Sequence, residues 1–65
     1  DSKVNINTAT LEELTSLPGI GQAKASSIIK YRENNGAFSS IEDIMKIEGI
    51  KAGVFNKIQD YILVE

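Results

Sequence analysis

Two glycine-centred segments of this chain combine residue types that suit the binding of an anion. Residues 17–21 read LPGIG and are called here the first hairpin; residues 47–51 read IEGIK and are called the second hairpin. Glycine adopts positive φ without steric cost and leaves the backbone open to close approach. A helix is predicted to follow each hairpin, and the first amides of a helix lack partners and carry positive partial charge. The two segments therefore predict two phosphate-binding sites.

Lysines accompany both hairpins. Lys24 follows the first hairpin, and we expect its ammonium to join the anion bound there; Lys51 ends the second hairpin and Lys57 lies further along the next helix. The side chains of Ile20 and Ile50 are expected to point inward and anchor the hairpins to the core. The predicted phosphate-binding residues are Gly19, Ile20, Gly21, Gln22 and Lys24 in the first copy, and Gly49, Ile50, Lys51, Gly53 and Lys57 in the second.

The hairpins belong to an internal repeat. A shift of 30 residues places Glu12 on Glu42, Gly19 on Gly49 and Ile28 on Ile58. Such a repeat implies two helix–turn–helix units related by a pseudo-twofold axis. Two similar anion sites that face the same way match the phosphates of the two strands of a duplex. Because phosphate contacts carry no base information, the pattern predicts sequence-independent binding of double-stranded DNA.

Helix signals place four short helices around the hairpins. The segment 10–13 (TLEE) is a predicted capping box that opens the first helix, and the segment 40–43 (SIED) is predicted to cap the third. Apolar spacing predicts a second helix over about residues 22–34 and a fourth over about 52–62. Residues 1–9 are expected to form a frayed polar end, on which Val4 and Ile6 could pack against the body. The predicted fold is all-α, and the buried side of the fourth helix is predicted to carry Val54, Phe55, Ile58, Tyr61 and Ile62.

Size and composition predict one domain over residues 1–65. The chain has no Cys and no His, so it can form neither a disulfide framework nor a Cys/His metal site. Seven basic and nine acidic residues give a net charge of −2, whereas DNA-binding domains usually carry a basic excess. This balance predicts modest affinity for DNA.

Catalysis is not predicted. The carboxylate pairs Glu12-Glu13 and Glu42-Asp43 open predicted helices, where the helix dipole stabilises their charged form. No nucleophile lies beside a candidate base. We therefore predict no catalytic residue, no metal-ligating side chain, no cofactor and no small-molecule substrate. A monovalent cation held by main-chain carbonyls of the first hairpin stays an open alternative.

The motifs resemble those of a known family. LPGIGQAKA and IEGIKAGVF resemble the hairpins of a tandem helix-hairpin-helix domain, and VNINTATLEEL with YRENNGAFSSIEDIMKIEGI resembles the DNA-binding domain of ComEA-type competence proteins. The resemblance covers about residues 4–62. It implies a compact tandem domain of four to five short helices with pseudo-twofold symmetry, with one unit at 10–35 and the other at 40–62.

The same resemblance implies a function. Proteins of this type are non-enzymatic receptors for double-stranded DNA in bacterial transformation, and they pass DNA to uptake-channel proteins. The resemblance also implies an extracytoplasmic location in the full-length protein, membrane-anchored or periplasmic, with an anchor outside this chain. Two alternatives stay open: a protein-interaction module built on the same scaffold, and a DNA-gripping accessory domain of a larger repair enzyme.

Overall fold

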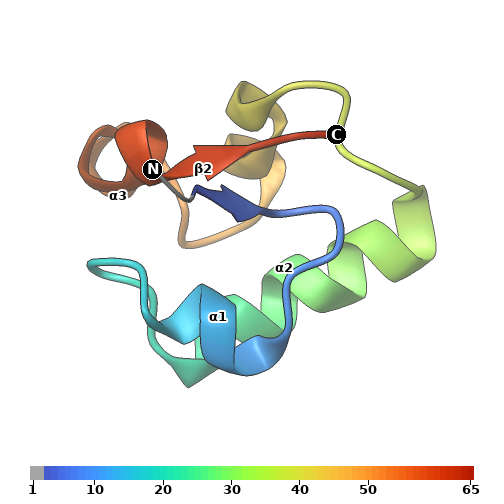
Figure 1. Cartoon of the computed structure of the whole chain (residues 1–65), viewed down its shortest axis with the longest axis horizontal. Coiled ribbons are helices and arrows are strands. Elements are labelled where there is room, and N and C mark those ends of the chain that lie inside the picture. Colours follow the sequence, from blue (N-terminus) through green and yellow to red (C-terminus); the bar gives the residue numbers. More distant parts are fainter. Residues whose placement is uncertain (1–2) are drawn as a thin grey trace.

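Short helices make up most of the computed structural model, which describes residues 3–65 (Figure 1). The helical elements are α1 (Leu11–Thr15), α2 (Gln22–Asn35), the 3-10 helix η1 (Ile41–Lys46), α3 (Ala52–Ile58) and the 3-10 helix η2 (Gln59–Tyr61). Two strands of two residues each, β1 (Val4–Asn5) and β2 (Ile62–Leu63), complete the element order. The prediction of a mostly helical fold is confirmed, and the small sheet is an addition to it.

A capping box opens α1 as predicted. The hydroxyl of Thr10 accepts a hydrogen bond from the amide of Glu13 at 3.2 Å, and Glu13 Oε1 accepts one from the amide of Thr10 at 2.9 Å. These two bonds satisfy donors that the helix itself leaves without partners. The helix ends at Thr15, and the amide of Ser16 donates to the carbonyl of Glu13 at 3.3 Å.

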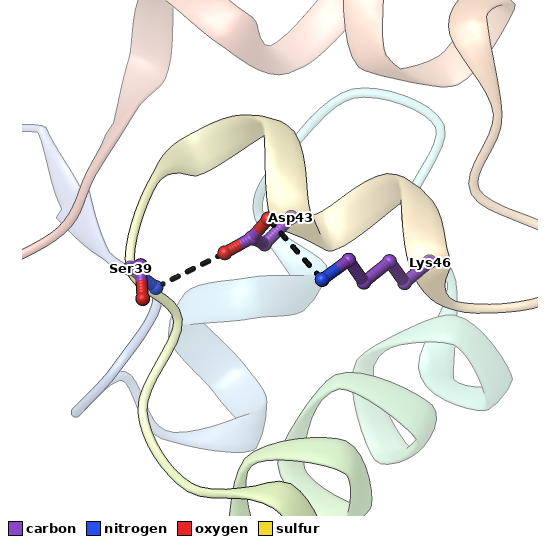
Figure 2. A network of polar contacts seen from close by, with 3 residues as sticks. All are labelled: Ser39, Asp43 and Lys46. Carbon is purple, nitrogen blue, oxygen red and sulfur yellow. Dashed lines mark hydrogen bonds and ion pairs between the residues drawn. The ribbon is translucent and has the colours of Figure 1, made fainter.

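The predicted cap at residues 40–43 is wrong. The element that follows is a 3-10 helix, in which the amide of Asp43 donates to the main-chain carbonyl of Ser40 at 3.1 Å. The Ser40 hydroxyl makes no capping bond. The Asp43 carboxylate instead accepts from the amide of Ser39 at 3.2 Å and lies 3.7 Å from Lys46 Nζ (Figure 2). Because Lys46 is exposed, this ion pair adds little to the stability of η1.

The two ends of the described chain lie side by side in a parallel pair of strands. Val4 lies opposite Ile62 and Asn5 opposite Leu63, and the amide of Ile6 donates to the carbonyl of Leu63 at 3.1 Å. The predicted frayed end is therefore wrong from residue 4 onward, whereas the expected packing of Val4 and Ile6 against the body is confirmed, since Ile6 is fully buried and Val4 packs against the core. Residues 1–2 lie outside the described residues.

The predicted fourth helix is too long. Helix α3 ends at Ile58, and after the 3-10 turn of η2 the backbone of Ile62 is extended, with φ −125° and ψ 157°. The extended backbone lets Ile62 pair with β1 while its side chain stays buried. Tyr61 lies beyond the end of α3 and therefore does not continue the buried side of that helix. Its side chain is 55% exposed, and its predicted burial is wrong.

One apolar core joins the two repeats. Its fully buried large side chains come from both repeats and from the terminal strands: Ile6, Leu14, Ile28, Ile44, Ile50, Ile58 and Ile62. Phe38, in the connector between the repeats, is buried, and its ring stacks on Tyr31 with centroids 5.2 Å apart. Among residues 3–65, no polar or charged side chain is buried.

Arg32 fastens the first segment to α2. Its guanidinium donates to the carbonyls of Ile6 at 2.9 Å and Ala9 at 2.7 Å. These bonds hold the chain against α2 before α1 begins. No helix within residues 3–65 has the length and apolarity to cross a membrane.

Candidate nucleic-acid interface

Both hairpins are tight turns with the same backbone geometry. The amide of Ile20 donates to the carbonyl of Leu17, and the amide of Ile50 to that of Ile47, each at 3.1 Å. The third residue of each turn has positive φ, 79° at Gly19 and 92° at Gly49. A positive φ at this position defines a type II turn and favours glycine. The positive φ expected at the two central glycines is therefore confirmed.

The helices that follow the hairpins begin without a side-chain cap. The N-cap of α2 is Gly21, which has no side chain, and that of α3 is Lys51, whose side chain makes no capping hydrogen bond within the described part of the chain. By contrast, Thr10 caps α1 through its hydroxyl. The first amides of a helix have no acceptor within the helix. Those of α2 and α3 can therefore donate to an external acceptor.

The first turns of these two helices differ in charge from those of the other helices. The first turn of α1 contains Glu12 and Glu13, and that of η1 contains Glu42 and Asp43. Within residues 3–65, the first turns of α2 and α3 contain no acidic side chain. Because carboxylates usually stabilise a helix start, their absence after both hairpins is informative. It keeps negative charge off the helix starts where an anion is predicted to bind.

The predicted contact residues divide by exposure. The isoleucine side chains at 20 and 50 are buried, as expected for anchors, and Lys24 is half-buried. The remaining predicted contact residues are exposed: Gly19, Gly21, Gln22, Gly49, Lys51, Gly53 and Lys57. The main chain of both hairpins is thus presented at the surface while the isoleucines hold it to the core.

The structure brings the two hairpins together. A Cβ atom added to Gly19 would lie 3.8 Å from Cδ of Lys57, and one added to Gly49 would lie 3.7 Å from Cε of Lys24. Each hairpin therefore lies against the helix that follows the other hairpin. Figure 1 shows the loop between α1 and α2 and the loop before α3 running along the same side of the domain, on the left of the view. The geometry corresponds to one surface that contains both turns.

Lysine placement differs from the expectation drawn along the chain. Lys24 was expected to serve the first hairpin, yet its side chain lies over Gly49 of the second. The ammonium of Lys51 donates to the carbonyl of Met45 at 3.2 Å, at the end of η1. Spacing in the sequence could not reveal either arrangement, since both depend on how the repeats pack.

Glu48 is a feature of the second hairpin to which the sequence interpretation gave no role. It is exposed and directly precedes Gly49, at the position that Pro18 occupies in the first hairpin. The alignment of LPGIG with IEGIK could have revealed this difference, because glutamate stands in the second segment where the first has proline. A negative charge at this point opposes the binding of a phosphate.

Among residues 3–65, no group of three or more His, Cys, Asp or Glu residues could hold a metal ion. The carbonyls of the first hairpin are the groups that would hold the monovalent cation considered above. Of these, the carbonyl of Leu17 accepts the hydrogen bond that closes the turn.

Comparison with known families gives a match along nearly the whole chain. The family described as the helix-hairpin-helix motif matches residues 1–63. This match agrees with the resemblance stated from the hairpins and with the prediction that the domain is not itself an enzyme.

Several curated proteins contain a related segment. The chain is 56% identical over 62 residues to ComE operon protein 1 of Bacillus subtilis (strain 168), a match that covers 95% of this chain and 30% of that protein. It is 44% identical over 62 residues to an uncharacterized protein of Haemophilus influenzae, covering 94% of this chain and 55% of that protein. The similarity to ComE operon protein 1 agrees with the predicted resemblance to ComEA-type competence proteins.

A third relative has a different context. The chain is 44% identical over 62 residues to endonuclease/exonuclease/phosphatase family domain-containing protein 1 of Homo sapiens, covering 95% of this chain and 11% of that protein. The chain thus spans 11% to 55% of the length of these three relatives.

Proposed function

Because the chain belongs to the helix-hairpin-helix family, we propose that it binds double-stranded DNA through phosphates, without reading base sequence. The observation that carries the proposal is the pairing of two exposed glycine turns on one surface, each followed by a helix that starts without a cap or an acidic residue. Main-chain amides and lysine ammonium groups are the donors that phosphate oxygens accept from most readily. Neither kind of donor distinguishes one base from another.

The proposed contacts use the predicted residues. The amides of Gly19, Gly21 and Gln22 face one strand, and those of Gly49, Lys51 and Gly53 face the other. Lys24 and Lys57 add positive charge beside the turns. The amides of the isoleucines at 20 and 50 close the turns, and their buried side chains anchor them to the core.

The net charge of −2 limits the affinity that these contacts provide. With about four phosphate contacts, the logarithm of the association constant is expected to fall with the logarithm of salt concentration with a slope of about −3 to −4. Fluorescence anisotropy of labelled duplexes of different sequence, measured across a salt series, tests this. The proposal is supported if all duplexes bind with equal affinity and show that salt dependence. It is contradicted if the affinity does not change with salt concentration or differs between duplex sequences.

Charge reversal at the hairpins supplies a matched comparison. Lys24→Glu and Lys57→Glu are expected to weaken duplex binding strongly, because each places a carboxylate beside a glycine turn. Lys30→Glu is the control: Lys30 is exposed on α2, about two helical turns beyond its start. Circular dichroism establishes that all three variants stay folded. Equal losses in the three variants would show that net charge, and not the hairpins, governs binding.

We propose a role in DNA uptake, on the strength of the 56% identity to ComE operon protein 1. In that setting the domain presents its hairpins to DNA outside the cytoplasm, and uptake-channel proteins are its partners. The observation that favours a second candidate, an accessory domain that grips DNA for a larger enzyme, is the match to 11% of a family member that also contains an endonuclease/exonuclease/phosphatase domain. The sequence that flanks these 65 residues in the full reading frame distinguishes the two.

A further inference from the structure

The two lysine side chains nearest the central glycines cross between the repeats. Lys57 belongs to α3, which follows the second hairpin, yet its Cδ lies over Gly19 of the first hairpin. Lys24 belongs to α2, which follows the first hairpin, yet its Cε lies over Gly49 of the second. The two lysines do not occupy corresponding positions of the repeat: a shift of 30 residues pairs Lys24 with Val54 and Lys57 with Ser27.

The glycines provide the surface on which these lysine stems lie. A Cβ at Gly19 or Gly49 would stand at ordinary van der Waals distance from the opposing stem, 3.8 Å or 3.7 Å. Lysine commonly lays its methylene stem along a surface while its ammonium stays in water. Lys24 is accordingly half-buried although it belongs to the first turn of its helix. The lysine stems would therefore leave room for a Cβ, and it is the positive φ that favours glycine at both positions.

The side-chain charge of the second hairpin's own lysine is directed elsewhere. Lys51 Nζ donates to the carbonyl of Met45 at 3.2 Å, which turns its charge toward the end of η1. Glu48 adds a carboxylate beside the same turn. A phosphate at the second hairpin therefore depends on a cation from outside that repeat, and Lys24 is the cation placed over Gly49.

We propose that the two repeats exchange lysines in binding DNA: Lys57 completes the phosphate site of the first hairpin, and Lys24 completes that of the second. This inference rests on the proposed function and assigns the two lysines within it. Because each phosphate is then held by groups from both repeats, neither repeat forms a complete site alone.

The exchange is tested by NMR on the 15N-labelled 65-residue chain with a short duplex of mixed sequence. Lys57→Met and Lys24→Met remove the charge and keep an apolar stem over the glycine. At saturating duplex, Lys57→Met is expected to reduce the DNA-induced amide shifts at Gly19 and Gly21. Lys24→Met is expected to reduce those at Gly49 and Lys51. Each change is expected to weaken binding roughly two- to fivefold, as for an exposed charge pair. The matched control Lys30→Met leaves both patterns unchanged.

The outcomes separate the exchange from the function on which it rests. Reduction at the opposite hairpin supports the exchange. If Lys24→Met instead acts on the first hairpin and Lys57→Met on the second, or if either acts equally on both, the exchange is wrong and DNA binding stands. If the unsubstituted chain shows no shift at either hairpin on addition of duplex, the proposed function itself fails. Amide shifts of the DNA-free variants, compared with those of the unsubstituted chain, establish that the turns are intact.

Discussion

At the residue scale, the two hairpins share a backbone and differ in charge. Gly19 and Gly49 both have positive φ and both turns close with a hydrogen bond of 3.1 Å. The residue before the central glycine is Pro18 in one and Glu48 in the other, and both are exposed. Proline at this position pre-sets the turn, whereas glutamate sets no φ and adds a negative charge. We therefore expect the first hairpin to be the better phosphate site and the second to be improved by a single change.

Replacing Glu48 by glutamine is expected to tighten duplex binding about twofold at low salt. The substitution keeps the size of the side chain and removes a charge that repels phosphate across water. Screening shortens the reach of exposed charges as salt rises, so the gain is expected to vanish at high salt. Anisotropy titrations at two salt concentrations measure both effects.

Glu33→Gln is the matched control for this prediction. Glu33 is exposed near the far end of α2, and its substitution makes the same change in net charge. If Glu33→Gln tightens binding as much as Glu48→Gln does, the effect belongs to net charge, and the assignment of Glu48 to the phosphate site is wrong.

At the scale of elements, the helices differ in the charge of their first turns. The start of α1 is closed by the Thr10–Glu13 bonds, whereas η1, α2 and α3 start without a side-chain cap in the described chain. The first turns of α1 and η1, which precede the hairpins, contain acidic side chains, and those of α2 and α3, which follow the hairpins, contain none within residues 3–65. We therefore expect an anion to bind at the starts of α2 and α3.

Thr10→Ala and Ser40→Ala are predicted to differ although the two residues correspond in the repeat. Thr10 accepts a capping bond, so its loss is expected to cost about 1 kcal/mol of the free energy of unfolding. The Ser40 hydroxyl makes no such bond, so its removal is expected to cost less than about 0.5 kcal/mol. Urea denaturation followed by circular dichroism measures both; equal losses would show that Ser40 does cap η1 in solution.

The helices and strands also show which features of the fold could be predicted from sequence patterns. The repeat and the hairpins predicted the helix order, because glycine and proline act through local backbone geometry. The capping pattern at residues 40–43 failed because S-x-x-D fits both an α-helix and the observed 3-10 helix. The placement of Lys24 over Gly49 and of Lys57 over Gly19 lay beyond any local pattern, since it depends on the packing of one repeat against the other. Strand β2 was missed because its pairing with residues 4–5 is long-range.

At the scale of the whole molecule, the terminal segments close the domain around the repeats. Asn7 accepts from the amide of Phe38 at 2.7 Å and donates to its carbonyl at 3.1 Å, which ties the first segment to the connector between the repeats. The guanidinium of Arg32 holds the same segment against α2. The internal repeat alone therefore does not make the core; residues 4–9 complete it. The relative position of the two hairpins depends on this closure, because it holds the two repeats together.

Ile6→Ala is predicted to destabilise the whole domain and not only its first segment. Ile6 is fully buried, and truncation of such a side chain costs about 2–5 kcal/mol. A domain of this length has a total stability of only about 3–10 kcal/mol, so a large share is lost. Ile6→Val removes a single methylene and is expected to cost about 1 kcal/mol. Urea denaturation is expected to show one shifted transition, in circular dichroism and in the amide signals of Gly19 and Gly49 alike. If the glycine signals keep their midpoint while the first segment melts, the terminal strands are an independent unit and the hairpins do not depend on them.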